Sequence, residues 1–445
     1  MILRALLTAF VLLLAAGLPA RAVEVQRVVS PGGIEAWLVE DHSNPIISLE
    51  LAFRGGAALD PRGREGLAVM VAGLIDEGAG ELDSRAFRER LEDLSIRLSF
   101  DASLDQFDGT LRTLTENRDT AFDLLRLALT APRFDDEPVE RIRGQILAGL
   151  RQSAEDPDEI ASRTIMRLYF PDHPYGRPAE GTPESVAAIE AADLKRFVAE
   201  RFGRDMLKIA VVGDIDAETL AALLDRSFLA LPARAAAAKV ADTRPQAAGE
   251  VVVIEKSMPQ SVVSFGHVGI KRADPDFYAA YVVNYILGGG GFSARLYEEI
   301  REKRGLAYSV YSFLSPLEHA GLVVGGVATQ NGRVGESIGL IREEWARMAA
   351  EGPSADELEA AKTFLTGSYP LRQSSSGRIA GMLLGIQLQD LGIDYINRRN
   401  SLIEAVTLED ARRVAKRLYD ESLLTFVVVG LPDGVSATRE APGGS

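Results

Sequence analysis

The sequence predicts an α+β fold made of two similar halves. Strand-like apolar runs come first in each half, long helical stretches follow, and each half closes on an apolar run that ends in glycine. This order predicts a sheet packed against a layer of helices in each half. A chain of 445 residues, of which 47% are hydrophobic, is large enough to bury two such cores.

The first half is expected to span residues 23–232. Runs of β-branched and apolar residues predict its strands, and apolar residues at helical spacing predict its helices. In chain order, the predicted elements are strands at 36–39 and 46–53, a helix at 66–75, strands at 96–101 and 106–114, helices at 120–129 and 139–154, and a strand at 207–213.

The second half, residues 251–432, repeats this order. Its predicted elements are strands at 251–254 and 262–268, a helix at 277–287, strands at 307–314 and 321–329, helices at 334–350 and 355–369, and a strand at 424–430. Residues 233–250 have no core-forming pattern, which predicts a linker between the halves. The polar residues 433–445 predict a disordered tail.

The first 22 residues have the pattern of a signal peptide. Residues 1–4 carry a positive charge, residues 5–18 are apolar, and Ala20-Arg21-Ala22 places small residues at the cleavage site, which predicts a mature N-terminus at Val23. An apolar run of this length is shorter than the roughly 20 residues of a membrane span. We expect export to a bacterial periplasm without stable membrane insertion; an uncleaved anchor is the alternative.

The charge balance argues against one class of partner. The formal net charge is −15, and such an acidic chain is expected to bind nucleic acid poorly. Acidity of this kind commonly serves solubility alone. It is also compatible with a preference for basic or unstructured polypeptides as partners.

Residues 54–80 closely resemble the zinc-binding segment of pitrilysin/insulinase-type peptidases, in which Gly-Leu-Ala precedes an inverted H-x-x-E-H on a helix. By this resemblance, the two histidine positions hold Val69 and Gly73, and the catalytic glutamate position holds Ala72. The family's third metal ligand, about 75 residues downstream, falls at Gly149. All three ligands and the base are replaced.

The histidine content leads to the same expectation without an alignment. A zinc site on one helix needs imidazoles at i and i+4. The chain has four histidines, no two within five residues, and no cysteine; the histidines are His42, His173, His267 and His319. We therefore expect no metal in this chain; a site assembled from the four scattered histidines is the alternative. His173, in a Pro/Gly turn, is expected to have a structural or loop-capping role.

A second motif of the same family is intact. Residues 287–296 resemble the glycine loop before the family's functional helix, and residues 301–308 match its arginine and tyrosine, spaced by seven. The resemblance implies that Arg301 and Tyr308 contact the substrate and its oxyanion.

The local pattern around this pair leaves two interpretations open. Leu296 and Ile300 indicate a helix from Ser293 that Gly305 ends, and a strand begins after it, so Arg301 and Tyr308 could face one cavity. A guanidinium and a phenol suit a substrate carbonyl and the oxyanion formed from it. Alternatively, Tyr308 is a core residue, because it alternates with apolar neighbours, and Arg301 is a solvated helix residue.

The glycine run also has rival interpretations. Phosphate-binding loops need lysine and serine or threonine after the glycines, and a nucleophile elbow needs a preceding strand and a final glycine; the sequence supplies neither. Gly289, Gly290 and Gly291 would let a substrate backbone approach closely, or they form a simple turn between two helices.

The resemblance implies a function as well as a fold. Chains of this family pair as two facing bowls around a closed chamber, so each α/β-roll pair forms half of a clamshell. We expect a non-catalytic subunit of a heterodimeric peptidase, with the zinc and H-x-x-E-H in a homologous partner, and peptides or unfolded polypeptides as substrates. The alternatives are a peptide-binding or scaffold protein with no role in hydrolysis and an autonomous enzyme of other chemistry.

Overall fold

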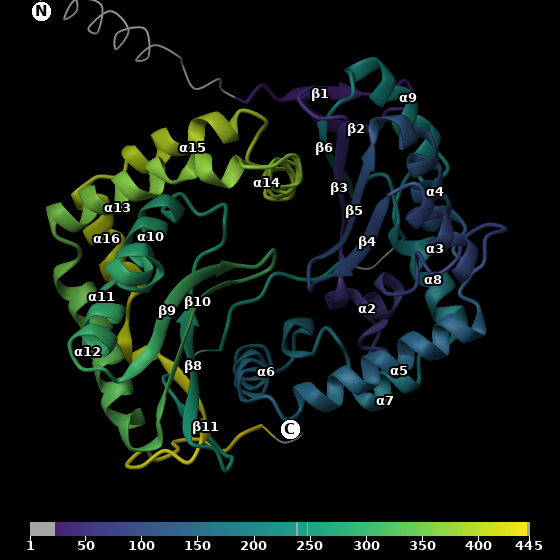
Figure 1. Ribbon diagram of the computed structural model, residues 1–445. Coiled ribbons are helices and arrows are strands. Elements are labelled where there is room, and N and C mark those ends of the chain that lie inside the picture. Colours follow the sequence, from purple (N-terminus) through teal and green to yellow (C-terminus); the bar gives the residue numbers. More distant parts are fainter. Residues whose placement is uncertain (1–22, 237–238, 247, 443–445) are drawn as a thin grey trace, which may run out of the picture.

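The computed structural model describes residues 23–236, 239–246 and 248–442, so the predicted signal peptide lies outside the described part. Two halves, each a sheet packed with helices, face one another across the molecule (Figure 1). The predicted α+β class with two similar halves is confirmed. Every described helix is too short or too polar to cross a lipid bilayer.

The first sheet has six strands in the order β1-β2-β6-β3-β5-β4. The strands are β1 (Gln26–Val29), β2 (Glu35–Glu40), β3 (Ile46–Arg54), β4 (Arg97–Ala102), β5 (Gln106–Leu114) and β6 (Leu207–Gly213). The closing strand of the half, β6, lies between β2 and β3; it runs parallel to β2 and antiparallel to β3. Its apolar residues are buried on both faces, which explains its continuous hydrophobic run.

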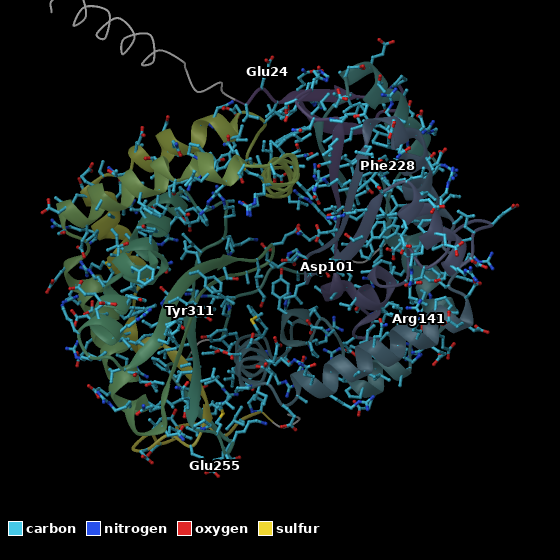
Figure 2. All side chains as sticks on the ribbon, in the orientation of Figure 1. Glu24, Asp101, Arg141, Phe228, Glu255 and Tyr311 are labelled. Carbon is cyan, nitrogen blue, oxygen red and sulfur yellow. The ribbon has the colours of Figure 1, made fainter. Side chains whose placement is uncertain are left out.

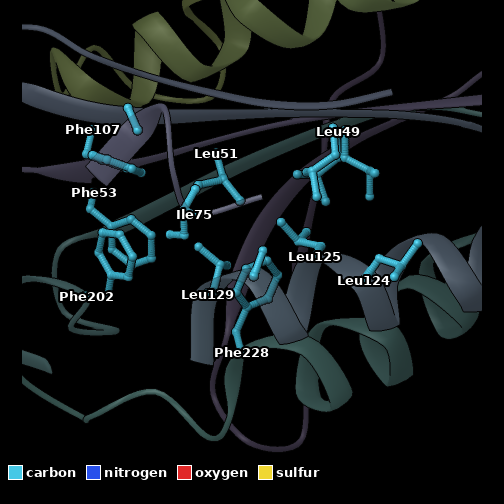
Figure 3. Packing of buried hydrophobic residues seen from close by; sticks show 14 of the residues in the cluster. Leu49, Leu51, Phe53, Ile75, Phe107, Leu124, Leu125, Leu129, Phe202 and Phe228 are labelled. Atoms are coloured by element: carbon cyan, nitrogen blue, oxygen red, sulfur yellow. The ribbon is translucent and has the colours of Figure 1, made fainter. Parts of the chain in front are cut away.

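Helices of the first half cover the outer face of this sheet. They are α2 (Leu67–Ala72), α3 (Ser84–Asp93), α4 (Arg118–Thr130), α5 (Asp136–Ser153), α7 (Pro183–Ala187), α8 (Ala191–Arg201) and α9 (Ala217–Phe228). Figure 3 shows the core between them, where Leu49, Leu51 and Phe53 of β3 meet Leu125 of α4 and Phe228 of α9. Alternate residues of β3 point to this core, as the period of two in its sequence requires.

The second sheet has five strands in the order β7-β11-β8-β10-β9. The strands are β7 (Val251–Glu255), β8 (Gln260–Val268), β9 (Ala307–Pro316), β10 (Gly321–Gln330) and β11 (Thr425–Gly430). The helices are α10 (Phe277–Asn284), α11 (Arg295–Tyr297), α12 (Val334–Glu351), α13 (Ala355–Gly367), α15 (Tyr395–Glu404) and α16 (Leu408–Leu418). As in the first half, the closing strand lies inside the sheet: β11 runs parallel to β7 and antiparallel to β8.

The two halves exchange one helix each. Helix α6 (Pro157–Tyr169) belongs to the first half but packs on β8 and β11 of the second sheet, and α14 (Ser376–Leu388) of the second half packs on β3 and β6 of the first sheet. In Figure 1 both helices lie between the two sheets. The contact is apolar: Leu383 of α14 packs with Trp37 and Val212 in one buried cluster. Each sheet is therefore covered on its inner face by the other half.

The linker and the tail both lie against the two halves. Thr243 in the linker donates a backbone hydrogen bond to His319, and Gln246 donates one to Tyr169. Residues 433–442 of the tail, which the sequence predicts as disordered, include Thr438, whose backbone N–H donates to Val251 at 2.8 Å. The described part of the tail thus contacts the first residue of β7.

Candidate functional site

The position of helix α2 depends on a buried carboxylate. Asp60, 3% exposed, accepts a hydrogen bond from the backbone N–H of Ala68 and forms an ion pair with Arg201 of α8 at 3.1 Å. Arg201 also donates to the carbonyls of Gly56 and Leu59. Burial raises the pKa of Asp60 to about 6, and Arg201 acts in the opposite direction. The ion pair therefore fixes the start of α2 against α8.

The positions of the family's zinc ligands carry no metal-binding side chain. Val69 packs against the core of the first half, Ala72 is 5% exposed, and a Cβ at Gly73 would lie 3.2 Å from Ile142 of α5. A Cβ at Gly149, further along α5, would meet nothing within 4 Å. Since none of these positions offers a nitrogen, oxygen or sulfur ligand, the residues present do not fit a zinc ion.

Each of the four histidines has its own polar partner, and the rings of His173 and His319 both lie beside that of Tyr175. His42 contacts Asp214 at 2.7 Å, His173 contacts the carbonyl of Ala241 at 2.9 Å, His267 accepts from the Trp345 indole at 2.8 Å, and His319 contacts Asp242 at 3.1 Å. His173 also caps a short helical turn by accepting from the N–H of Tyr175, which is the loop-capping role expected for it. Burial lowers the pKa of His267 to about 4, so this imidazole is neutral in the core.

A group of side chains of the kinds that can bind metals lies where the β4–β5 turn of the first half meets the β9–β10 turn of the second. Asp105, Glu318 and His319 place one ligand atom each within 4.8 Å of one another. Both oxygens of Asp105 already accept hydrogen bonds, one from the Tyr175 hydroxyl at 2.5 Å and one from the Glu318 backbone at 3.0 Å. The group therefore ties the two halves together.

The glycine segment begins in a π-helical turn that continues α10, η4 (Tyr285–Gly289). Asn284, 5% exposed, holds this turn against β9: its side-chain amide donates to the Ser312 carbonyl and accepts from the Ser312 hydroxyl. A Cβ at Gly288 would lie 2.8 Å from the Ser312 nitrogen, so only glycine fits there. Gly291, at φ +57°, then turns the chain toward α11.

The segment before Arg301 is anchored to a neighbouring helix. Arg295 of α11 forms a bidentate ion pair with Glu357 of α13, with distances of 2.6 and 2.7 Å. These hydrogen bonds lower the pKa of the Glu357 carboxyl to about 2. Because two parallel hydrogen bonds fix orientation as well as distance, this pair sets the direction in which the helix leaves the glycines.

Arg301 lies in a second π-helical turn, η6 (Glu298–Glu302). The regular helix predicted from Ser293 starts two residues later, at α11, and widens into this turn. Gly305, at φ +60°, then ends it and donates to the Arg301 carbonyl at 2.8 Å, as the sequence predicts. Single π-helical turns are frequent at functional sites.

Buried and exposed side chains alternate along β9, but Tyr308 breaks this alternation because the strand register shifts at that point. Val327 of β10 pairs with Val310 and Thr329 pairs with Ala307, so two residues of β9, Tyr308 and Ser309, lie opposite one residue of β10. An extra residue of this kind turns the next side chain to the other face of the strand. Tyr308 is 83% exposed, so the alternative that it belongs to the core is wrong.

The structure brings the two predicted residues together. The Arg301 guanidinium carbon lies 4.7 Å from the centre of the Tyr308 ring. The same carbon lies 4.8 Å from the centre of the Tyr297 ring and 5.8 Å from that of Phe292. These two aromatic residues are not predicted from the sequence; the available signal was their spacing, with Phe292 directly after the glycines and Tyr297 five residues later.

Tyr308 and Arg301 belong to the second half, and α2 belongs to the first. In Figure 2, Tyr311 of β9 is labelled in one half and Asp101 of β4 in the other. Within this chain, the Arg301–Tyr308 pair and the degenerate ligand positions of α2 therefore belong to different halves.

Comparison with known proteins agrees with the two-half architecture. The family profile described as "Insulinase (Peptidase family M16)" matches residues 36–183, and the profile "Peptidase M16 inactive domain" matches residues 188–365. The chain is 30% identical to the "Non-peptidase homolog YmxG" of Helicobacter pylori over 415 residues, 93% of this chain and 95% of that one. It is 31% identical to an uncharacterized zinc protease of Streptomyces coelicolor, over 72% of this chain and 71% of that one.

Solved structures show the same fold. A crystal structure described as the peptidase M16 inactive domain from Pseudomonas fluorescens superposes with a TM-score of 0.86 and 29% identity, covering 94% of this chain and all of that one. A protease from Helicobacter pylori superposes with a TM-score of 0.82 at 17% identity, over 91% of this chain and 99% of that one. The chain thus belongs to peptidase family M16, the insulinase family, and carries no metal-binding side chain at the family's zinc positions on α2.

Proposed function

We propose that this chain is the non-catalytic subunit of a periplasmic zinc peptidase made of two related chains, and that it supplies Arg301 and Tyr308 to the shared site. The observation that carries the proposal is the Arg301–Tyr308 pair, in which Tyr308 is exposed and Arg301 half-buried. Two π-helical turns and a register shift position this pair, while α2 has no ligand for a metal. A scaffold gains nothing from an exposed tyrosine and a half-buried arginine kept in this arrangement.

The chemistry of the pair fits peptide hydrolysis. The partner, a homologous chain with H-x-x-E-H, would supply the zinc and the base that activate water. Tyr308 would donate its hydroxyl hydrogen to the oxyanion that forms on the scissile carbonyl. Arg301 would donate to a neighbouring carbonyl of the substrate and hold the peptide in register. Substrates would be extended peptides or unfolded polypeptides, which expose these carbonyls.

Purified alone, the chain is expected to bind no stoichiometric zinc and to cleave no peptide. The reason is the set of side chains at positions 69, 72, 73 and 149, none of which can bind a metal or act as a base. Metal analysis of the dialysed protein and a peptidase assay with and without chelator measure this. About one tightly held zinc per chain, with activity that the chelator abolishes, would contradict the prediction.

The pairing itself is tested by co-expression. We would express this chain with a homologous chain from the same genome that carries H-x-x-E-H, purify through a tag on one chain, and assay peptide cleavage. A one-to-one complex that cleaves peptides, with little activity in either chain alone, supports the proposal. A complex that forms but gains no activity over the zinc-bearing chain supports the scaffold alternative instead.

A further inference from the structure

Three aromatic rings surround the Arg301 guanidinium. Its carbon lies 4.7 Å from the ring centre of Tyr308, 4.8 Å from that of Tyr297 and 5.8 Å from that of Phe292. The Phe292 and Tyr297 rings also meet edge to face, with centres 4.9 Å apart. Tyr297 is 5% exposed and forms the base of this aromatic cage, whereas Phe292 and Tyr308 are 79% and 83% exposed. Such rings attract a cation through their electron-rich faces.

The cage holds the guanidinium without using its hydrogen-bond donors. Among the described residues, Arg301 makes no hydrogen bond through its side chain, and its nearest carboxylate oxygen, on Glu302, is 4.0 Å from Nε. Arg295, six residues earlier, differs: its bidentate pair with Glu357 uses its donors. If Arg301 were paired in the same way as Arg295, that salt bridge would have to break before Arg301 could bind a substrate. Contact with a ring face instead leaves every N–H of the guanidinium available.

The Tyr297 hydroxyl oxygen is buried and has no hydrogen-bond partner within the described part of the chain. A buried tyrosine hydroxyl usually finds a partner. Tyr297 therefore contacts Arg301 through its ring, whose centre lies 4.8 Å from the guanidinium carbon, and not through a hydrogen bond of its hydroxyl.

We infer that Phe292 and Tyr297 are positioning residues, which hold the Arg301 guanidinium by cation–π contacts so that its donors are ready for the carbonyl groups of an extended peptide. This inference rests on the proposed function of Arg301. The acceptor is identified by its chemistry: neutral backbone carbonyls in a row, which take one or two N–H donors each. Tyr308 thereby has two parts with separate tasks, a ring in the cage and a hydroxyl for the oxyanion.

The first test uses the isolated chain, so it does not depend on a partner. In a nitrogen-15 spectrum of the arginine side chains, the ring currents should shift the Arg301 Nε–H signal upfield. Phe292→Leu should move this signal part of the way back, and Tyr297→Leu should move it further, while Tyr297→Phe should leave it in place. An unshifted Arg301 signal in the unmodified chain would overturn the cage.

The second test uses the active two-chain complex. Phe292→Leu should raise KM roughly two- to fivefold with little change in kcat, and Tyr297→Leu should raise it roughly five- to thirtyfold. Tyr297→Phe is the matched control and should behave like the unmodified complex. Phe292 is exposed, so its variant is expected to fold even if Tyr297→Leu does not.

A double-mutant cycle separates positioning from packing. In an Arg301→Ala background, Phe292→Leu should have no further effect on KM, because the group it positions is absent. An equal effect in both backgrounds, or a loss in Tyr297→Phe as large as in Tyr297→Leu, would overturn the inference. If Arg301→Ala itself leaves the kinetics unchanged, the proposed function fails, while the spectrum still decides whether the cage exists.

Discussion

Tyr308→Phe is expected to lower the turnover of the two-chain complex by about 10²–10³-fold, the usual cost of losing one oxyanion donor. The substitution removes only the hydroxyl and keeps the ring that contacts Arg301. Because the side chain is 83% exposed in this chain, the fold should not change. Steady-state kinetics of the complex measures the effect, with the zinc content and the amount of complex determined on the same samples.

Two further variants make this experiment specific. Arg301→Ala should raise KM as well as lower turnover. The substitution removes the contact with the substrate carbonyl from the ground state as well as from the transition state. Tyr311→Phe, on the same strand, is a control for the loss of a partly exposed hydroxyl and should leave the kinetics unchanged. Unchanged turnover in Tyr308→Phe would remove the shared site and favour the scaffold alternative. A complex that no longer assembles would show a structural role instead.

Arg201→Ala is expected to destabilise the chain by about 3–5 kcal/mol, because it leaves Asp60 buried without its counter-charge. Asp60 and Arg201 are 3% and 7% exposed, and Arg201 also binds two carbonyls and lies 4.2 Å over the Phe197 ring. Chemical denaturation at pH 7 measures the loss. Arg196→Ala on the same helix removes the ion pair of an exposed arginine with Asp193, which keeps its pair with Arg64, and should cost no more than about 1 kcal/mol.

The pH dependence of the Arg201→Ala variant provides a second measurement. Asp60 has a folded pKa of about 6, above its usual 3.8, so protonation favours the folded state. Without Arg201 the folded pKa should rise further. The free energy of unfolding of the variant should therefore recover, relative to the unmodified chain, as the pH falls from 7 through 6. A difference between the two proteins that does not change with pH would mean that Asp60 is not the cause.

The sequence predicted most of the strands and the position of the Arg301–Tyr308 pair, for a physical reason. A period of two along β3 and the glycine at 305 act over a few residues, so they can be read without the rest of the chain. The exposure of Tyr308 could not be predicted in this way. It depends on the pairing of β9 with β10, where Val327 and Thr329 set the register, and alternation alone would place Tyr308 in the core.

The exchanged helices are not predicted from the sequence for a related reason. Helix α14 lies in a stretch of the second half for which the sequence pattern predicts no element. Its apolar side chains Ala380 and Leu383 match a surface formed by Trp37 and Val212, more than 150 residues away in the chain. Periodicity shows that such a helix has an apolar face, but it does not show which surface that face covers.

The exchange of α6 and α14 has a consequence for the order in which the protein matures. A ribosome completes β6 well before it reaches residue 376, where α14 begins, so the inner face of the first sheet stays bare during that interval. Contacts between residues so distant in the chain form slowly. The first half therefore cannot complete its packing until α14 has been made. A product truncated before residue 376 would leave Trp37 and Val212 without the apolar side chains of α14 that cover them.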